Sequence, residues 1–312
     1  AQRVRQSIKK GLKLSVLNPA FDDWQLSIEN KICVAPIEMV AGLARIIKAV
    51  ADETNQAISC DFVDLCAQVS VDDESLAVAR SLASGRRSAI WLGNYAVQHK
   101  NAAQIHALSQ EIARLVNCAF GVIGEAANSV GGYLAGAVPF GRIEGKNAVQ
   151  MLSTPLKAYI LAGVEPDLDI ADGVSAVKSL REAEMVAALT VFKSQSLLDL
   201  ADVLLPIAPF TETAGVFVNC EGRAQAFHPV TKSAGESRAG WKVLRVIGSA
   251  LELDGFDFGT IEDVRNKVLG NSVAVDSLKL GNLLAIERFT LPGAVSGIQR
   301  IADIPIYSAD PI

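Results

Sequence analysis

Polar residues that could bind an anion are concentrated between Thr211 and Arg223. The segment combines acids, an asparagine, an arginine and two glycines: Glu212, Gly215, Asn219, Glu221, Gly222 and Arg223. The guanidinium of Arg223 could hold a phosphate or carboxylate through paired hydrogen bonds, or it could pair with Glu212 or Glu221. The net charge of −5 gives no sign of an anion-binding surface, so we favour the ion pair. The two glycines can adopt positive φ or admit a second backbone or a ligand.

A second candidate region is the glycine-rich stretch 121–145, in which Asn128, Gly131 and Gly132 follow a predicted strand. A glycine-rich loop at that place can cradle phosphate. The stretch lacks the spacing G-x-G-x-x-G, and no G-K-[ST] follows it, so it fails the test for a nucleotide-binding motif. We therefore interpret these residues as a loop without a present function.

Histidine and cysteine give no catalytic or metal-binding pattern. His99 and His106 have no nearby Cys or Ser motif, and we expect both to be solvated; His228 follows the Arg223 segment. The five cysteines are Cys33, Cys60, Cys66, Cys118 and Cys220, and no two of them form C-x-x-C. Zinc and iron–sulfur sites need closely grouped ligands, so we expect buried free thiols, no metal and no catalytic residue.

Composition narrows the class of protein. Half of the 312 residues are hydrophobic and 20% are charged, which requires a large core or an apolar surface that meets a partner. No apolar run reaches the roughly 18 residues of a membrane span, and the start of the sequence does not show the pattern of a signal peptide. The negative net charge argues against nucleic acid as a partner.

The elements that position the polar segment form an α/β pattern. Val203-Leu204-Leu205 is an apolar run that ends at Pro206, and we expect a short strand buried on both faces. Upstream, apolar strands alternate with amphipathic helices, which predicts parallel βαβ units. We expect strands at 12–17, 32–35, 88–92, 119–123, 156–161 and 185–192, and helices at 3–13, 105–115, 175–183 and 241–251, after Pro36 and after Asp72. Residues 52–71, and the chain beyond Gly255, show no regular pattern.

The polar segment resembles the molybdopterin oxidoreductase superfamily. There, an alanine-aspartate-valine run ends in leucine-proline, and a glutamate, a glycine, an asparagine and a glutamate-glycine-arginine follow. Those places are held here by Ala201, Asp202, Val203, Leu205, Pro206, Glu212, Gly215, Asn219, Glu221, Gly222 and Arg223. Val216 departs from the pattern, which usually has threonine. The resemblance implies two Rossmann-like lobes of the formate dehydrogenase and DMSO reductase type.

Residues 123–138 and 158–169 are similar to one branch of that superfamily, the large iron–sulfur subunits of bacterial NADH:quinone oxidoreductase, or complex I. In that branch, an N-terminal region carries 4Fe-4S and 2Fe-2S clusters that pass electrons from NADH toward quinone, and the rest is a scaffold without molybdenum. The resemblance runs from about Arg3 to about Tyr307. It implies that the cluster region lies before Ala1 and that a β-barrel domain follows this chain.

The function implied is therefore that of a non-catalytic scaffold, inactive by itself, within an enzyme that oxidises NADH. No cofactor is expected here, and Asn128, Gly131, Gly132 and the motif residues 212–223 are interpreted as vestiges of cofactor loops. The implied partners are the other subunits of the peripheral arm, on the cytoplasmic side of the bacterial inner membrane.

We expect lobes at 1–139 and 140–255 and an irregular tail at 256–312 that leads to a further domain.

Two other functions stay open. One is a fragment of a molybdopterin-binding oxidoreductase related to formate dehydrogenase, whose molybdenum ligand would lie before Ala1. The other is a free-standing nucleotide-binding module, which the failed glycine spacing disfavours.

Apolar surface predicts self-association. Candidate exposed residues are Tyr133, Leu134, Val138 and Phe140 in the glycine-rich stretch and Ile304, Ile306 and Tyr307 in the tail. Large contiguous apolar patches are rare on soluble monomers and usually mark a contact with a partner.

Overall fold

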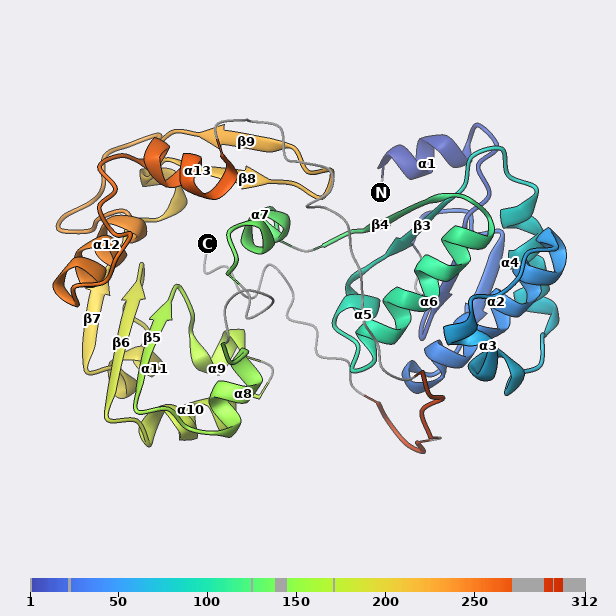
Figure 1. The fold of residues 1–312 in the computed structure, drawn as a ribbon, viewed down its shortest axis with the longest axis horizontal. Coiled ribbons are helices and arrows are strands. Elements are labelled where there is room, and N and C mark those ends of the chain that lie inside the picture. The colour runs from blue at the N-terminus through green and yellow to red at the C-terminus, as the bar shows by residue number, and fades with distance from the viewer. Residues whose placement is uncertain are drawn as a thin grey trace. The chain divides into compact units, whose positions relative to one another are not determined.

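The computed structural model describes residues 2–21, 24–124, 126–137, 145–170, 172–270, 289–293 and 295–299. The chain divides into two compact units between Gly124 and Glu125 (Figure 1). The division predicted after residue 139 falls in a stretch outside the described residues and stays a prediction. The described residues near the C-terminus, 289–293 and 295–299, belong to the first unit.

The first unit contains two short parallel sheets and a layer of helices. Its elements are α1 (Gln2–Ile8), β1 (Ser15–Asn18), β2 (Asn30–Cys33), η1 (Pro36–Glu38), α2 (Met39–Thr54), α3 (Cys60–Ala67), α4 (Asp73–Ala83), β3 (Ala89–Leu92), α5 (Asn94–Val97), α6 (Ala102–Leu115) and β4 (Ala119–Val122). Strand β1 pairs with β2, and β3 pairs with β4, both in parallel. The strands and helices predicted for this half are thus present, with ends shifted by a few residues.

Helix α2 is the centre of the first unit. Val40, Ile47 and Val50 are fully buried, and they recur at the helical spacing from which the helix was predicted. The helix packs against both α4 and α6. It ends at Asn55, whose φ of 53° closes the last turn in the left-handed conformation that asparagine tolerates well.

The expectation that residues 52–71 are irregular is wrong for Cys60–Ala67, which form helix α3. Phe62, Leu65 and Cys66 lie on one face of that helix and are buried. The spacing i, i+3, i+4 carried the signal, but the helix is short and Asp61 and Asp64 dilute the apolar pattern.

The second unit is built around a three-stranded parallel sheet in the order β5-β6-β7. Its elements are α7 (Ser129–Leu134), α8 (Ala148–Ser153), β5 (Ala158–Ala162), α9 (Pro166–Asp169), α10 (Gly173–Arg181), β6 (Met185–Thr190), α11 (Gln195–Leu200), β7 (Val203–Pro206), η2 (Phe210–Glu212), β8 (Gly215–Val218), β9 (Ala224–Phe227), α12 (Gly240–Ala250) and α13 (Ile261–Leu269). The predicted α/β class with parallel sheets is confirmed; β8 and β9 form an antiparallel pair besides.

Strand β7 corrects the expectation of burial on both faces. Val203 is 39% exposed, because β7 lies at the side of the sheet and, among the described strands, only β6 pairs with it along its length. Asp202 fixes the start of β7: its carboxylate accepts a hydrogen bond of 2.7 Å from the Val186 amide of β6.

Helix α13 corrects the expectation of an irregular tail after Gly255. Thr260 caps the helix, its hydroxyl accepting from the Asp263 amide while the Asp263 carboxylate accepts from the Thr260 amide. This reciprocal arrangement is a capping box, and Thr-x-x-Asp was its signal in the sequence.

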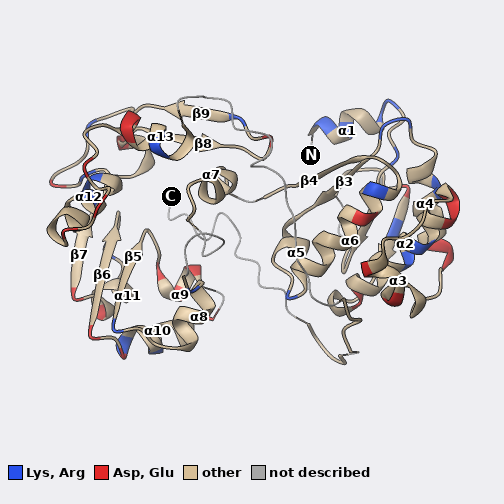
Figure 2. Cartoon of the chain, in the orientation of Figure 1, with Lys and Arg blue, Asp and Glu red and all other residues tan. Residues whose placement is uncertain are grey.

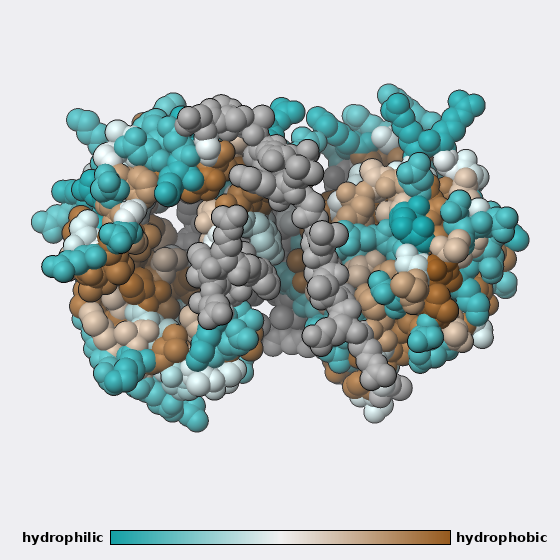
Figure 3. Space-filling view, viewed as in Figure 1, coloured by the Kyte–Doolittle hydropathy of each residue, from teal (hydrophilic) through white to brown (hydrophobic). Residues whose placement is uncertain are grey.

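Charged residues are scattered over both units, whereas apolar residues gather in one area of the second unit. Lysine, arginine, aspartate and glutamate are spread over both units without a continuous basic stripe (Figure 2). In the second unit, apolar residues colour the visible surface over α12 and the neighbouring part of the sheet (Figure 3). No helix among the described residues has both the length and the apolar character that crossing a membrane requires.

Candidate functional site

The motif segment 212–223, where we expected a loop, contains the first strand and the turn of a β-hairpin that β9 completes. Strands β8 and β9 pair in register from Gly215 with Phe227 to Val218 with Ala224. The Asn219 side chain accepts hydrogen bonds from the amides of Glu221 and Arg223 at 3.0 and 2.9 Å. Gly222 has a φ of 77°, which glycine adopts without strain. Asn219 and Gly222 therefore build the turn itself.

Gly215 serves a different purpose from the positive φ that we considered, because its φ lies outside the left-handed region. It stands opposite Phe227 in the hairpin, and a Cβ built on it would lie 2.6 Å from Cζ of that ring. The absence of a side chain at 215 lets Phe227 lie across the strand and make an edge-to-face contact with Phe217 at 4.8 Å.

The structure brings the glycine-rich stretch to this hairpin. The Asn128 side-chain oxygen accepts a hydrogen bond of 2.8 Å from the Val218 amide, across 90 positions of sequence. A Cβ at Gly131 would overlap the Asn128 amide, whereas a Cβ at Gly132 would have no atom within 4 Å. Asn128 and Gly131 thus act together to attach α7 to β8, and Gly132 takes no part in the contact.

Glu212 is also engaged within the chain. Its carboxylate accepts a hydrogen bond of 2.9 Å from the Ala234 amide, which holds the loop that follows β9. The expected ion pair of Arg223 with Glu212 or Glu221 is not found among the described residues. The turn directs the side chains of Glu221 and Arg223 toward solvent, and both residues are exposed.

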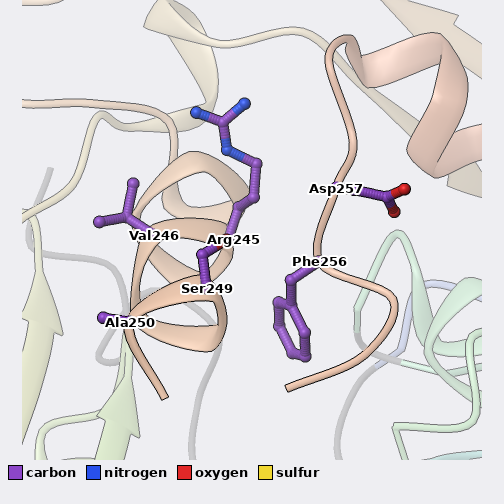
Figure 4. Close-up of a pocket in the computed structure, with 6 residues that line it drawn as sticks. All are labelled: Arg245, Val246, Ser249, Ala250, Phe256 and Asp257. Atoms are coloured by element: carbon purple, nitrogen blue, oxygen red, sulfur yellow. The ribbon is translucent and has the colours of Figure 1, made fainter. Parts of the chain in front are cut away.

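The motif residues do not line the groove that the structure shows among the described residues. A groove of about 490 Å³ lies elsewhere in the second unit, between α12 and the segment that follows it. Figure 4 shows Phe256 directed into this groove, while Arg245 and Asp257 point apart. Arg245 is held by the Phe258 carbonyl at 2.9 Å. Ligand sites combine an apolar lining with converging polar groups, and the polar groups here do not converge.

The histidines of the first unit correct the expectation that they are solvated. His99 is 5% exposed; its Nε2 lies 2.9 Å from the Pro36 carbonyl, and its Nδ1 accepts from the Asn101 amide at 2.9 Å. These contacts fit a neutral ring protonated on Nε2. Burial lowers the pKa of His99, and the charge of Lys100 acts in the same direction. His106 is half-buried against Phe120, and burial lowers its pKa as well.

The cysteines are all free, as predicted, but three of the five are exposed and only Cys66 is fully buried. Burial raises the pKa of Cys66 to about 11, with the charge of Glu111 adding to the effect, so its thiol stays protonated at neutral pH. No three His, Cys, Asp or Glu side chains of the described residues are grouped so that they could hold a metal ion.

A buried ionic network in the first unit was not found from the sequence. Glu111 on α6 is 4% exposed and accepts hydrogen bonds from the amide and hydroxyl of Ser59 and from Arg114 at 2.8–2.9 Å. Burial alone would raise the pKa of Glu111, but the hydrogen bonds from Arg114 and Ser59 hold it below its ordinary value. The network ties the start of α3 to α6. The i, i+3 pair of Glu111 and Arg114 was its one local signal.

The described motif residues do not fit a molybdopterin. Such a ligand carries phosphate, which needs several converging donors or a glycine cradle open to the ligand. At Gly131 the open space is taken by the Asn128 amide, and Arg223 is the sole cation of segment 212–223. The side chains of Asn128, Asn219 and Glu212 instead accept hydrogen bonds from backbone amides of the chain itself.

Comparison with known proteins agrees with the resemblance seen in the sequence. The family model "Molybdopterin oxidoreductase" matches residues 2–250. A subunit of the NADH-quinone oxidoreductase of Mycobacterium bovis is 32% identical over 115 residues, which are 36% of this chain and 14% of that protein. The F420-dependent formate dehydrogenase subunit alpha of Methanocaldococcus jannaschii is 26% identical over 114 residues, 36% of this chain and 17% of that protein. The chain therefore spans only a small part of the length of either relative.

A solved structure supports the same fold. Acetylene hydratase from Pelobacter acetylenicus superposes with a TM-score of 0.64 at 16% identity, over 85% of this chain and 46% of that chain. At this identity the likeness concerns the fold alone. The family model spans well over half of the sequence and includes both the glycine-rich stretch and the hairpin, so the chain belongs to the molybdopterin oxidoreductase family.

Proposed function

We propose that this chain is the non-catalytic scaffold portion of the large iron–sulfur subunit of an NADH:quinone oxidoreductase. One observation carries the proposal: the motif side chains that form hydrogen bonds form them with backbone groups of this same chain. Asn128 binds Val218, Asn219 forms the hairpin turn and Glu212 binds Ala234. Side chains committed in this way are not available to hold a cofactor.

The similarity to a subunit of the mycobacterial NADH-quinone oxidoreductase supports the choice within the family. In this proposal, iron–sulfur clusters of another part of the subunit carry electrons from NADH toward quinone. The present residues bind no cofactor and hold neighbouring subunits of the peripheral arm in position, on the cytoplasmic side of the inner membrane.

A second candidate is a portion of a molybdopterin-binding oxidoreductase related to formate dehydrogenase. The side chains of Glu221 and Arg223, for which the structure shows no ion pair among the described residues, favour it. Arginine is suited to binding phosphate through paired hydrogen bonds. The formate dehydrogenase relative, at 26% identity, agrees with this alternative.

The two functions predict different assemblies in the cell. The protein, tagged in its own cells and purified with its natural partners, should co-purify with NADH-oxidising activity that reduces a soluble quinone. Co-purification with formate-oxidising activity and none toward NADH would contradict the proposal and favour the alternative. An Arg223→Ala variant separates the two further. The scaffold account expects its activity to be unchanged, whereas a phosphate-binding arginine predicts loss of activity with loss of bound cofactor.

A further inference from the structure

Strand β5 leaves one edge of the parallel sheet open. The sheet order is β5-β6-β7, and no described strand pairs with the other side of β5 (Figure 1). The Lys157 carbonyl and the Gly163 amide form hydrogen bonds with β6. Because the direction of the backbone groups alternates along a strand, the N–H and C=O groups of the odd-numbered residues of β5 point toward β6. The N–H and C=O groups of Ala158, Ile160 and Ala162 therefore point outward.

This edge lacks the features that usually protect an edge strand. Folded proteins place charges, prolines or bulges there to prevent pairing with another chain. The strand reads Ala-Tyr-Ile-Leu-Ala and contains none of these. Ile160 is 54% exposed, and the register places it beside Ala187 and Val203 on one face of the sheet. A parallel sheet normally has both faces covered. Leu189 on this face is buried, but Ile160 and Val203 are exposed, so the face is open at these two residues in the described part of the chain.

The charges that flank β5 suit a two-fold arrangement. Lys157 precedes the strand, and its exposed side chain makes a solvent-facing ion pair of 3.4 Å with Glu184, while Glu165 and Asp167 follow the end of the strand. In an antiparallel pair of identical strands, the start of each strand lies beside the end of the other. Lys157 of each copy then lies near Glu165 and Asp167 of the other copy, so the two-fold arrangement forms this contact at both ends of the strand pair.

We propose that β5 pairs antiparallel with β5 of a second copy of this chain, centred on Ile160. Ile160 then stands opposite its own counterpart, and Ala158 stands opposite Ala162. All of these residues have outward backbone groups, so each pair exchanges both of its hydrogen bonds. The two Ile160 side chains lie on the same face and contact each other across the strands. The inference concerns the chain by itself and does not rest on the proposed function.

Sedimentation velocity over a concentration series tests the pairing. The wild-type chain is expected to form dimers. Ile160→Lys should weaken the dimer at least about tenfold in Kd, because a charge directed into a strand edge opposes pairing. Ile160→Pro should have the same effect and leave the sheet intact, since the N–H that it removes points outward. Val246→Lys is the matched control: Val246 is 58% exposed and lies on α12, outside β5 and the acidic segment that follows it, so the dimer of this variant should be unchanged.

Charge reversal supplies an independent readout. Lys157→Glu should weaken the dimer, and adding Glu165→Lys and Asp167→Lys should restore it. Circular dichroism establishes that each variant is folded, and Ile160→Lys keeps the test valid if Ile160→Pro does not fold. A wild-type chain that is monomeric at all concentrations would overturn the proposal. So would a dimer that survives both Ile160 variants or that Val246→Lys abolishes.

Discussion

Replacing Asn128 by alanine should destabilise the second unit by about 1–3 kcal/mol, the usual cost of leaving a buried donor without a partner. The donor is the Val218 amide, which lies 2.8 Å from the Asn128 oxygen. Val218 is 2% exposed, so water cannot easily replace the lost contact. The change therefore removes one hydrogen bond and leaves an unsatisfied N–H behind.

Gly131 should be coupled to Asn128 energetically. Gly131→Ala displaces the Asn128 amide and should cost a similar amount, reduced by the better helix propensity of alanine, which is worth about 1 kcal/mol. Once Asn128 is alanine the overlap no longer exists, so Gly131→Ala should then stabilise the unit. Gly132→Ala is the matched control on the same helix: with no atom within 4 Å of its Cβ, it should be neutral or stabilising.

Urea denaturation followed by Trp241 fluorescence measures these effects in the second unit. Trp24 and Trp91, the other two tryptophans, belong to the first unit and would first be replaced by phenylalanine. The account predicts strongly non-additive effects of the Asn128 and Gly131 substitutions, as expected for residues in contact. Additive effects, or an Asn128→Ala variant as stable as its parent, would refute the view that this contact holds α7 on β8.

Three further predictions concern stability. Gly215→Val should destabilise the hairpin by roughly 1–3 kcal/mol through overlap with the Phe227 ring, and Phe227→Ala should remove most of that penalty in a double variant; additive losses would contradict the packing. Glu111→Gln should cost roughly 2–4 kcal/mol in a urea titration because a buried charged network is broken, whereas Glu53→Gln, at an exposed ion pair, should cost at most about 1 kcal/mol; equal costs would argue against the network. The pKa of His99 lies below the ordinary 6.5 in the folded state, so the unfolded chain binds the extra proton first and stability should fall as pH drops below about 6.5. A His99→Gln variant should flatten this profile, and an unchanged slope would show that the ring is not the cause.

Most helices and strands of the first unit could be predicted because their signals are local; α3, in the stretch expected to be irregular, is an exception. Val40, Ile47 and Val50 repeat at the helical period, and the apolar run at Ala89–Leu92 is followed by a glycine. The hairpin was missed because Gly215 reads locally as a turn residue, whereas its role depends on Phe227 on the partner strand. The contact of Asn128 with Val218 spans 90 positions, so no local pattern could reveal it.

Charged residues gave the least reliable predictions. Arg223 has acids nearby in sequence, and proximity suggested an ion pair, but the hairpin turn directs these side chains toward solvent. Glu111 was not noted as important, yet the fold buries it between Ser59 and Arg114. Side-chain pairing depends on the direction in which the backbone presents each residue, and sequence spacing fixes that direction only within a helix or a strand.

We propose that the motif residues of this chain have structural roles and hold no cofactor. The most direct test is to produce the chain in cells that make molybdenum cofactor, purify it and measure molybdenum, iron and pterin together. The account predicts that none of the three is present in stoichiometric amount and that Arg223→Ala leaves all of them unchanged. A stoichiometric pterin or molybdenum content that Arg223→Ala abolishes would contradict it.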